Sequence, residues 1–216
     1  MDRKEDRPKG EATNAPRPGE FYVVRPDFDT PPHEVSFENV QKLRPNPGGI
    51  IRPADGGFPD FGELPRLRET SPDHTLTDYQ NAFEGYWLVS DRLKTVFESV
   101  DPCGFEFRLC EFIRFDGVAG GAYYLCDVAR VLDAIDEDAS TLEIFRDGYP
   151  AGKYYGVAGA RLAFKKDILE GAHVFRSPFN GQLIVIDRIM RDALIEQGIG
   201  TWENGSGMCL DDASDY

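Results

Sequence analysis

The sequence has few of the side chains on which most enzymes and metal sites depend. Its three histidines, His33, His74 and His173, are far apart, and none stands in a pattern typical of a metal ligand or a catalytic base. The four cysteines form no CxxC pair, so we expect reduced, mostly buried thiols rather than a zinc or redox motif. Glycine-rich phosphate-binding motifs are also missing. We therefore predict no enzymatic activity, no cofactor and no metal ion.

Long apolar runs are missing as well. No stretch approaches the roughly 20 consecutive apolar residues of a membrane span. The opening MDRKEDRPKG carries charges of both signs with no hydrophobic region behind it, which is unlike a secretory signal peptide. The chain is therefore expected to be cytoplasmic and to bind no membrane.

Positive charge is scarce in this chain. Lysine and arginine number 24 against 38 aspartates and glutamates, and the formal net charge is −14. An acidic surface repels nucleic acid, whereas it attracts basic proteins and speeds their encounter. The composition thus predicts no binding of nucleic acid. It leaves two interpretations open: an acidic surface that serves solubility alone, and one that serves a basic protein partner.

Composition divides the 216 residues into four regions. Residues 1–19 are charged and rich in proline, which predicts a disordered tail. Residues 20–76 are crowded with proline and glycine, so we predict an irregular segment with short strands, the first at Phe21–Val24. Residues 77–204 are predicted to form an α+β domain, and residues 205–216 a flexible acidic tail that frays.

One local pattern recurs within residues 77–204. A short apolar strand is followed by an aspartate and then by a segment whose apolar residues recur at helical spacing. The pattern predicts helices at Arg92–Val100, Val128–Ile135 and Arg188–Gln197, with a weaker copy around Asp167. We therefore predict an α+β fold. It would have a mixed, mostly antiparallel sheet and three or four short helices entered directly from strands.

The aspartates at these junctions are Asp91, Asp127 and Asp187. We interpret them as helix caps, because a carboxylate at that position accepts the unpaired N–H groups of the first helical turn. The alternative is a small enzyme that uses these aspartates as catalytic carboxylates. Two of them side by side in a deep pocket would favour that alternative.

Acidic side chains gather after the middle predicted helix. The candidate partner-binding residues are Asp133, Asp136, Glu137, Asp138 and Glu143. They lack the regular oxygen spacing and the glycine of a calcium loop. One interpretation is the solvated end of a helix, and the other is a contact patch for a basic partner.

Three phenylalanines stand apart from the regular strands. Phe28, Phe58 and Phe61 lie among prolines and glycines in the irregular segment. We favour the interpretation that they tether this segment to the core. The alternative is that they are exposed anchors for a partner protein.

The stretch from about Tyr86 to Glu203 resembles a known family. The features that carry the resemblance are, in order, YWLVSDRLKTVFE, YYLCDVARVLDAID and AHVFRSPFNGQLIVIDRIMRDALIEQGIGTWE. They are similar to bacterial proteins once grouped as a domain of unknown function and now assigned as the eleventh family of polymorphic-toxin immunity proteins. The opening strand Phe21–Val24 also suits this family. The proline- and glycine-rich segment and the acidic C-terminal tail have no clear counterpart in it.

What the resemblance implies is binding. Such proteins are encoded beside a toxin and protect the producing cell from it, and the toxin domains are often nucleases. A nuclease holds a polyanion in a basic groove, so the expected partner is a cognate, basic toxin or effector domain. The family has no established catalytic residues, so none carries over to this chain. An effector adaptor or chaperone, which also binds a protein, stays open as an alternative.

Overall fold

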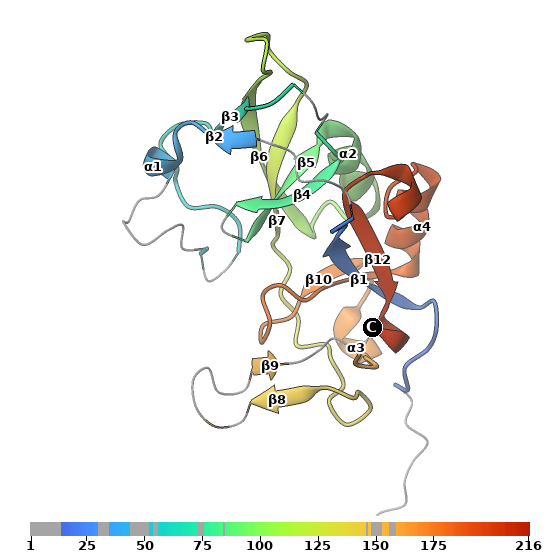
Figure 1. Ribbon diagram of the computed structural model, residues 1–216. Helices are drawn as coiled ribbons and strands as arrows, with labels where there is room; N and C mark the ends of the chain where they lie inside the picture. Colours follow the sequence, from blue (N-terminus) through green and yellow to red (C-terminus); the bar gives the residue numbers. More distant parts are fainter. Residues whose placement is uncertain are drawn as a thin grey trace, which may run out of the picture.

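The computed structural model describes residues 14–29, 35–43, 52–53, 56–72, 76–83, 85–145, 147, 153–155 and 159–216. Within these ranges lie twelve strands in three sheets and four α-helices. Figure 1 shows a six-stranded sheet at the top, a four-stranded sheet below it and a two-stranded ribbon at the bottom. The predicted α+β class is confirmed.

The four-stranded sheet brings the two ends of the chain together. Its strand order is β10-β11-β1-β12, and all neighbours are antiparallel. In chain order the strands are β1 (Phe21–Pro26), β10 (Val174–Arg176), β11 (Ile184–Asp187) and β12 (Met208–Asp212). Residue Tyr22 of β1 faces Ile186 of β11 on one side and Asp212 of β12 on the other. The predicted strand at Phe21–Val24 is confirmed as the greater part of β1.

The acidic C-terminal end is part of this sheet, so the prediction of a fraying tail at residues 205–216 is wrong. Met208–Asp212 forms β12, and the turn after it is the 3₁₀ helix η2 (Ala213–Asp215), whose Ala213 is buried. The carboxylate of Asp212 accepts the backbone N–H groups of Gly19 at 2.6 Å and Ser214 at 2.9 Å. Hydrogen bonds of this kind engage an acidic side chain that composition alone predicts to be solvated.

The six-stranded sheet has the order β2-β3-β6-β7-β5-β4. Only the β3–β6 pair is parallel, and the other neighbours are antiparallel, which confirms a mixed, mostly antiparallel arrangement. Its strands are β2 (Val35–Phe37), β3 (Arg66–Glu69), β4 (Tyr79–Phe83), β5 (Tyr86–Ser90), β6 (Phe105–Ile113) and β7 (Tyr123–Val128). The ribbon consists of β8 (Glu143–Phe145) and β9 (Lys153–Tyr155). Residues 20–76 thus contribute β1, β2 and β3 to two different sheets.

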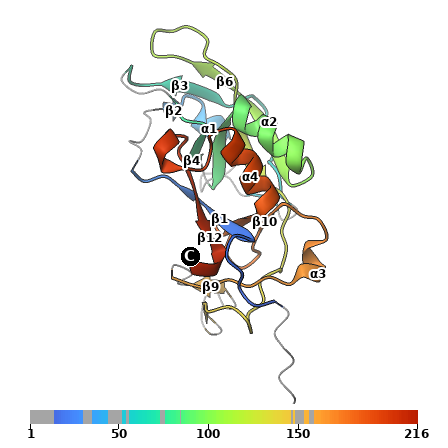
Figure 2. The same ribbon diagram turned by 90° about the vertical axis from the view of Figure 1, so that its right-hand side faces the viewer.

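Two helices follow strands directly, as predicted. Helix α2 (Asp91–Val100) begins where β5 ends, and α4 (Arg188–Glu196) begins where β11 ends. The two helices pack against each other and lie side by side in Figure 2. The other helices, α1 (Val40–Leu43) and α3 (Lys166–Leu169), are single turns, and η1 (Trp202–Asn204) is a 3₁₀ turn.

One hydrophobic cluster joins the two larger sheets and the helices α2 and α4. It contains buried side chains from β1, β5, β7, β11, α2 and α4, among others. Representative members are Val24, Val89, Leu93, Val128, Ile186, Met190 and Leu194. A second cluster lies on the other face of the four-stranded sheet, around Val23, Ile135, Phe164 and Val185. The four-stranded sheet is therefore covered on both faces.

The predicted helix at Val128–Ile135 is wrong. Strand β7 continues to Val128, and the chain then runs extended, with a bridge from Val131 to Arg176 and another from Ile135 to Phe164. The apolar residues recur at helical spacing, but their side chains lie in different parts of the protein. Val128 belongs to the cluster between the sheets and Ile135 to the second cluster, whereas Val131 is 44% exposed. Pairing with distant strands satisfies this backbone in place of helical hydrogen bonds.

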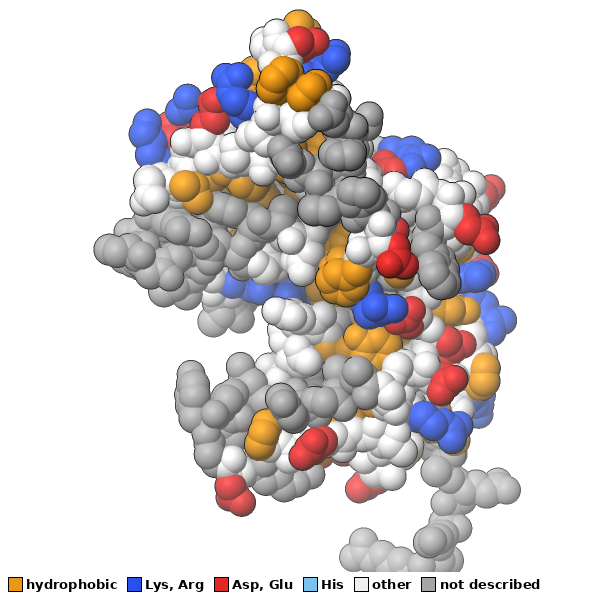
Figure 3. All heavy atoms as spheres, in the orientation of Figure 1, with side chains coloured by type: hydrophobic (Ala, Val, Ile, Leu, Met, Phe, Trp, Pro, Cys, Tyr) orange, Lys and Arg blue, Asp and Glu red, His pale blue; other side chains and the backbone are white. Residues whose placement is uncertain are grey.

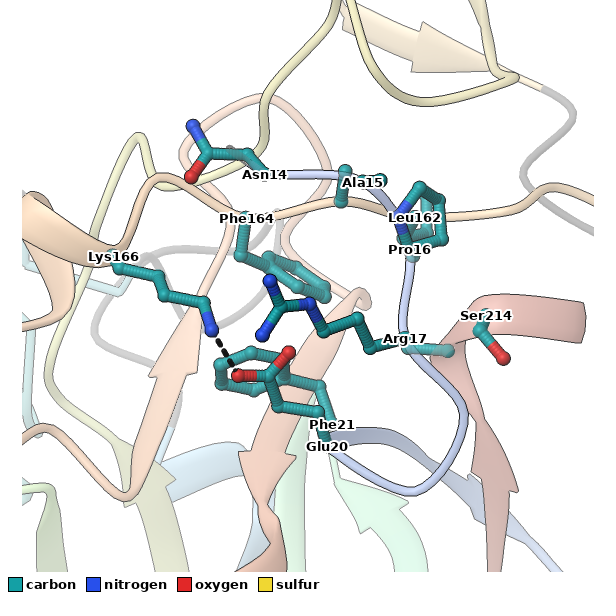
Figure 4. A pocket seen from close by; sticks show the side chains of 12 residues that line it. Asn14, Ala15, Pro16, Arg17, Glu20, Phe21, Leu162, Phe164, Lys166 and Ser214 are labelled. Atoms are coloured by element: carbon teal, nitrogen blue, oxygen red, sulfur yellow. Dashed lines mark hydrogen bonds and ion pairs between the residues drawn. The ribbon is translucent and has the colours of Figure 1, made fainter. Parts of the chain in front are cut away.

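The first described residues, 14–20, contact the body of the protein. Residues 1–13, most of the predicted disordered tail, lie outside the described ranges. Residues 14–20 run along the second cluster, and the Asn14 side-chain amide donates to Asp136 at 2.9 Å. In Figure 4, Lys166 points to Glu20 and forms an ion pair with it, while the rings of Phe21 and Phe164 lie close together, 4.6 Å between centroids. The hollow between these residues holds only about 10 Å³, so it is a packed seam rather than a ligand site.

Candidate functional site

The three junction aspartates lie in different surroundings. Asp187 caps α4, because its Oδ1 accepts the backbone N–H of Met190 at 3.0 Å, as predicted. At the start of α2 the cap is Ser90, whose hydroxyl oxygen accepts the N–H of Leu93 at 3.2 Å. The capping prediction is therefore wrong for Asp91, which is the first residue of that helix and instead accepts a hydrogen bond from the Tyr124 hydroxyl at 3.1 Å.

Asp127 caps no helix, so the third capping prediction is wrong. Its side chain is completely buried at the end of β7. Its Oδ1 lies 2.7 Å from the Arg52 guanidinium and 3.0 Å from that of Arg176, and its Oδ2 accepts the N–H of Gly57 at 2.8 Å. Arg176 also donates to the Val128 carbonyl. Burial, and then the nearby charge of Arg52, lowers the pKa of Arg176.

The segment around residue 57 is fastened to the same place by aromatic contacts. The hydroxyl of Tyr86 donates to the Gly57 carbonyl at 2.9 Å, and Arg52 lies over the Tyr86 ring at 4.7 Å. The ring of Phe58 stacks on Tyr86 with 4.7 Å between centroids, and Phe61 is buried in the same cluster. The prediction that Phe58 and Phe61 tether the irregular segment is confirmed. Burial raises the pKa of Tyr86 to about 12.

A second buried carboxylate, Asp101, lies at the end of α2. Arg130 donates to it with both terminal nitrogens, one at 2.9 Å, and the N–H of His173 donates at 2.9 Å. Burial works to raise the pKa of Asp101, but the Arg130 and His173 hydrogen bonds outweigh it, and the pKa is lowered. The ring Nδ1 of His173 lies 2.8 Å from Asp187, so these residues link Arg130 to the start of α4.

The three junction aspartates do not meet at one site. Asp187 lines an open hollow of about 560 Å³, whereas Asp127 is buried among protein donors. Among the described residues Asp91, Asp127 and Asp187 share no hydrogen-bond or ion-pair partner, so the side-by-side pair on which the enzyme alternative depends is not formed. Among the described residues no group of three or more His, Cys, Asp or Glu side chains is placed to hold a metal ion. Two of the histidines, His33 and His74, lie outside the described ranges. All four cysteines are free, and burial raises the pKa of Cys110 to about 12.

None of the five predicted partner-binding residues lies on a helix: four lie along the connection from β7 to β8, and Glu143 is the first residue of β8. Asp133, Glu137, Asp138 and Glu143 are exposed, and Asp136 is half-buried. Asp136 Oδ1 accepts the N–H groups of Asp138 and Ala139, both at 3.2 Å, which stabilises the turn there. In Figure 3, acidic side chains lie around β8 at the lower end of the molecule, whereas acidic and basic side chains alternate over the upper part. The structure therefore brings the five residues onto one exposed segment.

The third phenylalanine, Phe28, behaves unlike the other two. It follows β1 and is 80% exposed, the largest exposed fraction of any large apolar side chain described. It lines two hollows of about 310 Å³ and about 290 Å³. The tether interpretation is therefore wrong for Phe28, which leaves this ring accessible at the surface.

Sequence reasoning missed the arginines that hold the buried carboxylates. Arg52, Arg130 and Arg176 carry no local signal, because each lies far along the chain from the aspartate it contacts. The apolar run before Asp127 indicates a buried strand, but the same pattern precedes Asp187, so it could not show that Asp127 itself is buried.

Comparison with known proteins gives a family. The sequence model of the Immunity protein family (Imm11) matches residues 20–215. No curated protein matches this chain. Among the described residues no helix has the length and apolar character needed to cross a bilayer. The match spans both large sheets, from β1 to η2, including the proline- and glycine-rich segment and the C-terminal strand for which the resemblance found no counterpart. The chain belongs to the Imm11 family of immunity proteins.

Proposed function

We propose that this protein acts in the cytoplasm of a bacterium as the immunity partner of a cognate toxin or effector domain, which it binds and neutralises. The family match over residues 20–215 carries this proposal. The satisfied, buried carboxylates around Asp127 and Asp101 support binding rather than catalysis, because their oxygens are occupied by protein donors. The toxin would be blocked at its active site or at the entry of its substrate.

The net charge of −14 supports a basic toxin of the nuclease type. A nuclease groove must attract a polyanion, and an acidic protein that fits the groove competes for the same cationic side chains. Electrostatic attraction of this kind gives association rate constants of roughly 10⁸–10⁹ M⁻¹s⁻¹ at low salt. A stable complex would bury on the order of 1,600 Å² in total.

We place part of the contact on the acidic segment of Asp133, Asp136, Glu137, Asp138 and Glu143. The four exposed members are accessible without any change in the fold. Asp133 lies 3.9 Å from Lys165, which is a long and solvent-exposed pair that a partner's basic side chain can replace.

Co-expression tests the proposal. The toxin encoded beside this gene should stop growth when it is expressed alone, and growth should return when this protein is expressed with it. The purified pair should form a complex whose toxin has lost activity. Equal killing with and without this protein would contradict the proposal. If the protein binds its partner, leaves the activity intact and is needed for secretion, the adaptor or chaperone alternative is correct.

The acidic segment is tested by association kinetics. Changing the four exposed carboxylates to amides (Asp133→Asn, Glu137→Gln, Asp138→Asn and Glu143→Gln) should lower the association rate constant at low salt roughly tenfold. A matched set of four exposed carboxylates away from this segment (Glu38→Gln, Glu98→Gln, Glu111→Gln and Asp116→Asn) should have a smaller effect. Equal effects of the two sets would show that net charge, rather than this segment, is what attracts the partner.

A further inference from the structure

The two edges of the four-stranded sheet differ. At the β10 edge, the chain after β7 covers the backbone: the N–H of Arg176 donates to the Arg130 carbonyl at 2.9 Å, and the N–H of Leu132 donates to the Arg176 carbonyl at 3.1 Å. At the opposite edge, β12 is the last strand of the sheet, and its ladder partner among the described residues is β1. An edge strand presents N–H and C=O groups that another strand can pair with.

A hollow of about 310 Å³ reaches around the β12 edge, and we name it the edge hollow. It is lined by residues of β1, β12 and α4 and by residues 27–29. Leu210 packs toward the cluster that contains α4, whereas its neighbours Cys209 and Asp211 point to the other face, since successive residues of a strand alternate. All three line the edge hollow, so a partner in the hollow would contact both faces of β12 and its backbone.

Phe28 stands at the rim of this hollow. Its ring is 80% exposed, and Phe28 lines both the edge hollow and the neighbouring hollow of about 290 Å³. Aromatic side chains that bury a large area on binding dominate the energetics of many protein interfaces. This ring lies beside a strand edge that has no ladder partner among the described residues, so the surface offers an apolar side chain as well as backbone groups.

The charges of the edge hollow favour a basic occupant. Its ionisable side chains include three carboxylates, Asp27, Asp29 and Asp211, against two guanidinium groups, Arg25 and Arg191. Arg191 also lies 2.7 Å from Asp192, outside the hollow. Asp27 lies close enough to Cys209 to affect its thiol. Burial makes the largest contribution to raising the pKa of Cys209, and the charge of Asp27 makes the next largest.

We propose that an extended, basic segment of the toxin pairs with the outer edge of β12 as a fifth strand, with its lysine or arginine side chains beside Asp27 and Asp29 and an apolar side chain against Phe28. Addition of a strand to an exposed sheet edge is a general mode of peptide recognition. This inference rests on the proposed function, since it names where and how the toxin binds.

The proposed edge adjoins the acidic segment described above. Thr141, which lies within that segment before Glu143, bridges Arg161, and the Arg161 Nε donates to the Ser214 carbonyl at 3.2 Å, just beyond β12. Neighbouring chains in such ladders lie about 5 Å apart, so the two surfaces are on the order of 10 Å from each other. One toxin domain can contact both.

Calorimetry with a catalytically inactive toxin domain tests the anchor. Phe28→Ala should weaken binding at least about 30-fold, the effect of losing an aromatic hot spot. The matched control is Phe115→Ala, which removes a 53% exposed phenylalanine from the turn after β6 and should change the affinity less than about twofold. Both variants should unfold at the wild-type temperature, because both rings are largely exposed.

Hydrogen exchange of the wild-type complex tests the strand pairing without any substitution. The amide of Leu210, which points away from β1, should exchange at least tenfold more slowly when the toxin is bound, whereas the covered edge at β10 should show no such change. If the wild-type protein binds no toxin, the proposed function itself is overturned. If it binds with unchanged exchange in β12 and Phe28→Ala binds like the wild type, only the edge inference is overturned.

Discussion

Two strand ends in this protein look alike in sequence and behave differently in the structure. The run Leu183–Asp187 ends in an aspartate that caps α4 at its amino end, and its carboxylate remains one-fifth exposed. The run Tyr123–Asp127 also ends in an aspartate, but this one is fully buried and bound by two arginines, and no helix follows. The difference lies in what the rest of the chain places around each aspartate.

The comparison shows what a local pattern can and cannot predict. An apolar run before aspartate correctly marks the end of a buried strand in both cases. Whether a helix or an extended segment follows the strand depends on which acceptors bind the backbone N–H groups after the aspartate. After β11 the N–H groups are taken by the helix of residues 188–196, whereas after β7 they pair with β10 and with residues 163–164. Such long-range pairing leaves no signature within the short window that a periodicity test covers.

The largest expected effect comes from the buried junction. Asp127→Ala leaves the buried guanidinium of Arg176 without its carboxylate, and we expect the free energy of unfolding to fall by about 3–5 kcal/mol. Urea denaturation measures this loss. A companion variant with Asp127→Leu, Arg52→Met and Arg176→Met should recover most of the stability, because it removes the carboxylate and both of its guanidinium partners together. If Asp127→Ala lowered the free energy of unfolding by less than about 1 kcal/mol, the buried ion pair would not make the junction at Asp127 more important for stability than the junction at Asp187.

An intermediate effect is expected at Asp101, which holds one arginine and one backbone N–H. Asp101→Asn should cost about 2 kcal/mol at pH 7, the typical value for hydrogen bonds to a charged group. Because its pKa is lowered in the folded state, Asp101 contributes stability above its unfolded pKa of about 3.9, and this contribution is lost as the pH falls through the folded pKa. The variant should therefore lose less stability than the wild type on acidification below pH 4. Parallel pH profiles would contradict this explanation.

The smallest effect is expected at the capping junction. Asp187→Ala should lower the free energy of unfolding by about 1 kcal/mol, since an exposed part of the carboxylate can be replaced by water. Ser90→Ala, at the matching position before α2, should cost a similar amount. Thermal unfolding of both variants beside Asp127→Ala measures the contrast directly. A cost at Asp187 equal to that at Asp127 would show that the two junctions are energetically alike.

The sequence predicts those parts of the fold that local chemistry decides. The helices at residues 91–100 and 188–196, the strand β1 and the free cysteines follow from spacing and composition within a few residues. The edge strand β12 does not, because its partner β1 is nearly the whole chain away and its acidic residues resemble a solvated tail. For the candidate site, the acidic segment was visible as composition, but the exposure of Phe28 depends on which hollows the folded chain leaves beside it.

The position of β1 has a consequence for how the protein is made. This strand is synthesised early, but both of its neighbours, β11 and β12, come from the far end of the chain, and Arg25 and Asp211 are 186 positions apart. Contacts of such long range slow folding, because a large loop must close before they form. During translation β1 therefore waits with two open edges until the last strands emerge. The four-stranded sheet, and with it the β12 edge, therefore exists only in chains whose synthesis has passed residue 212.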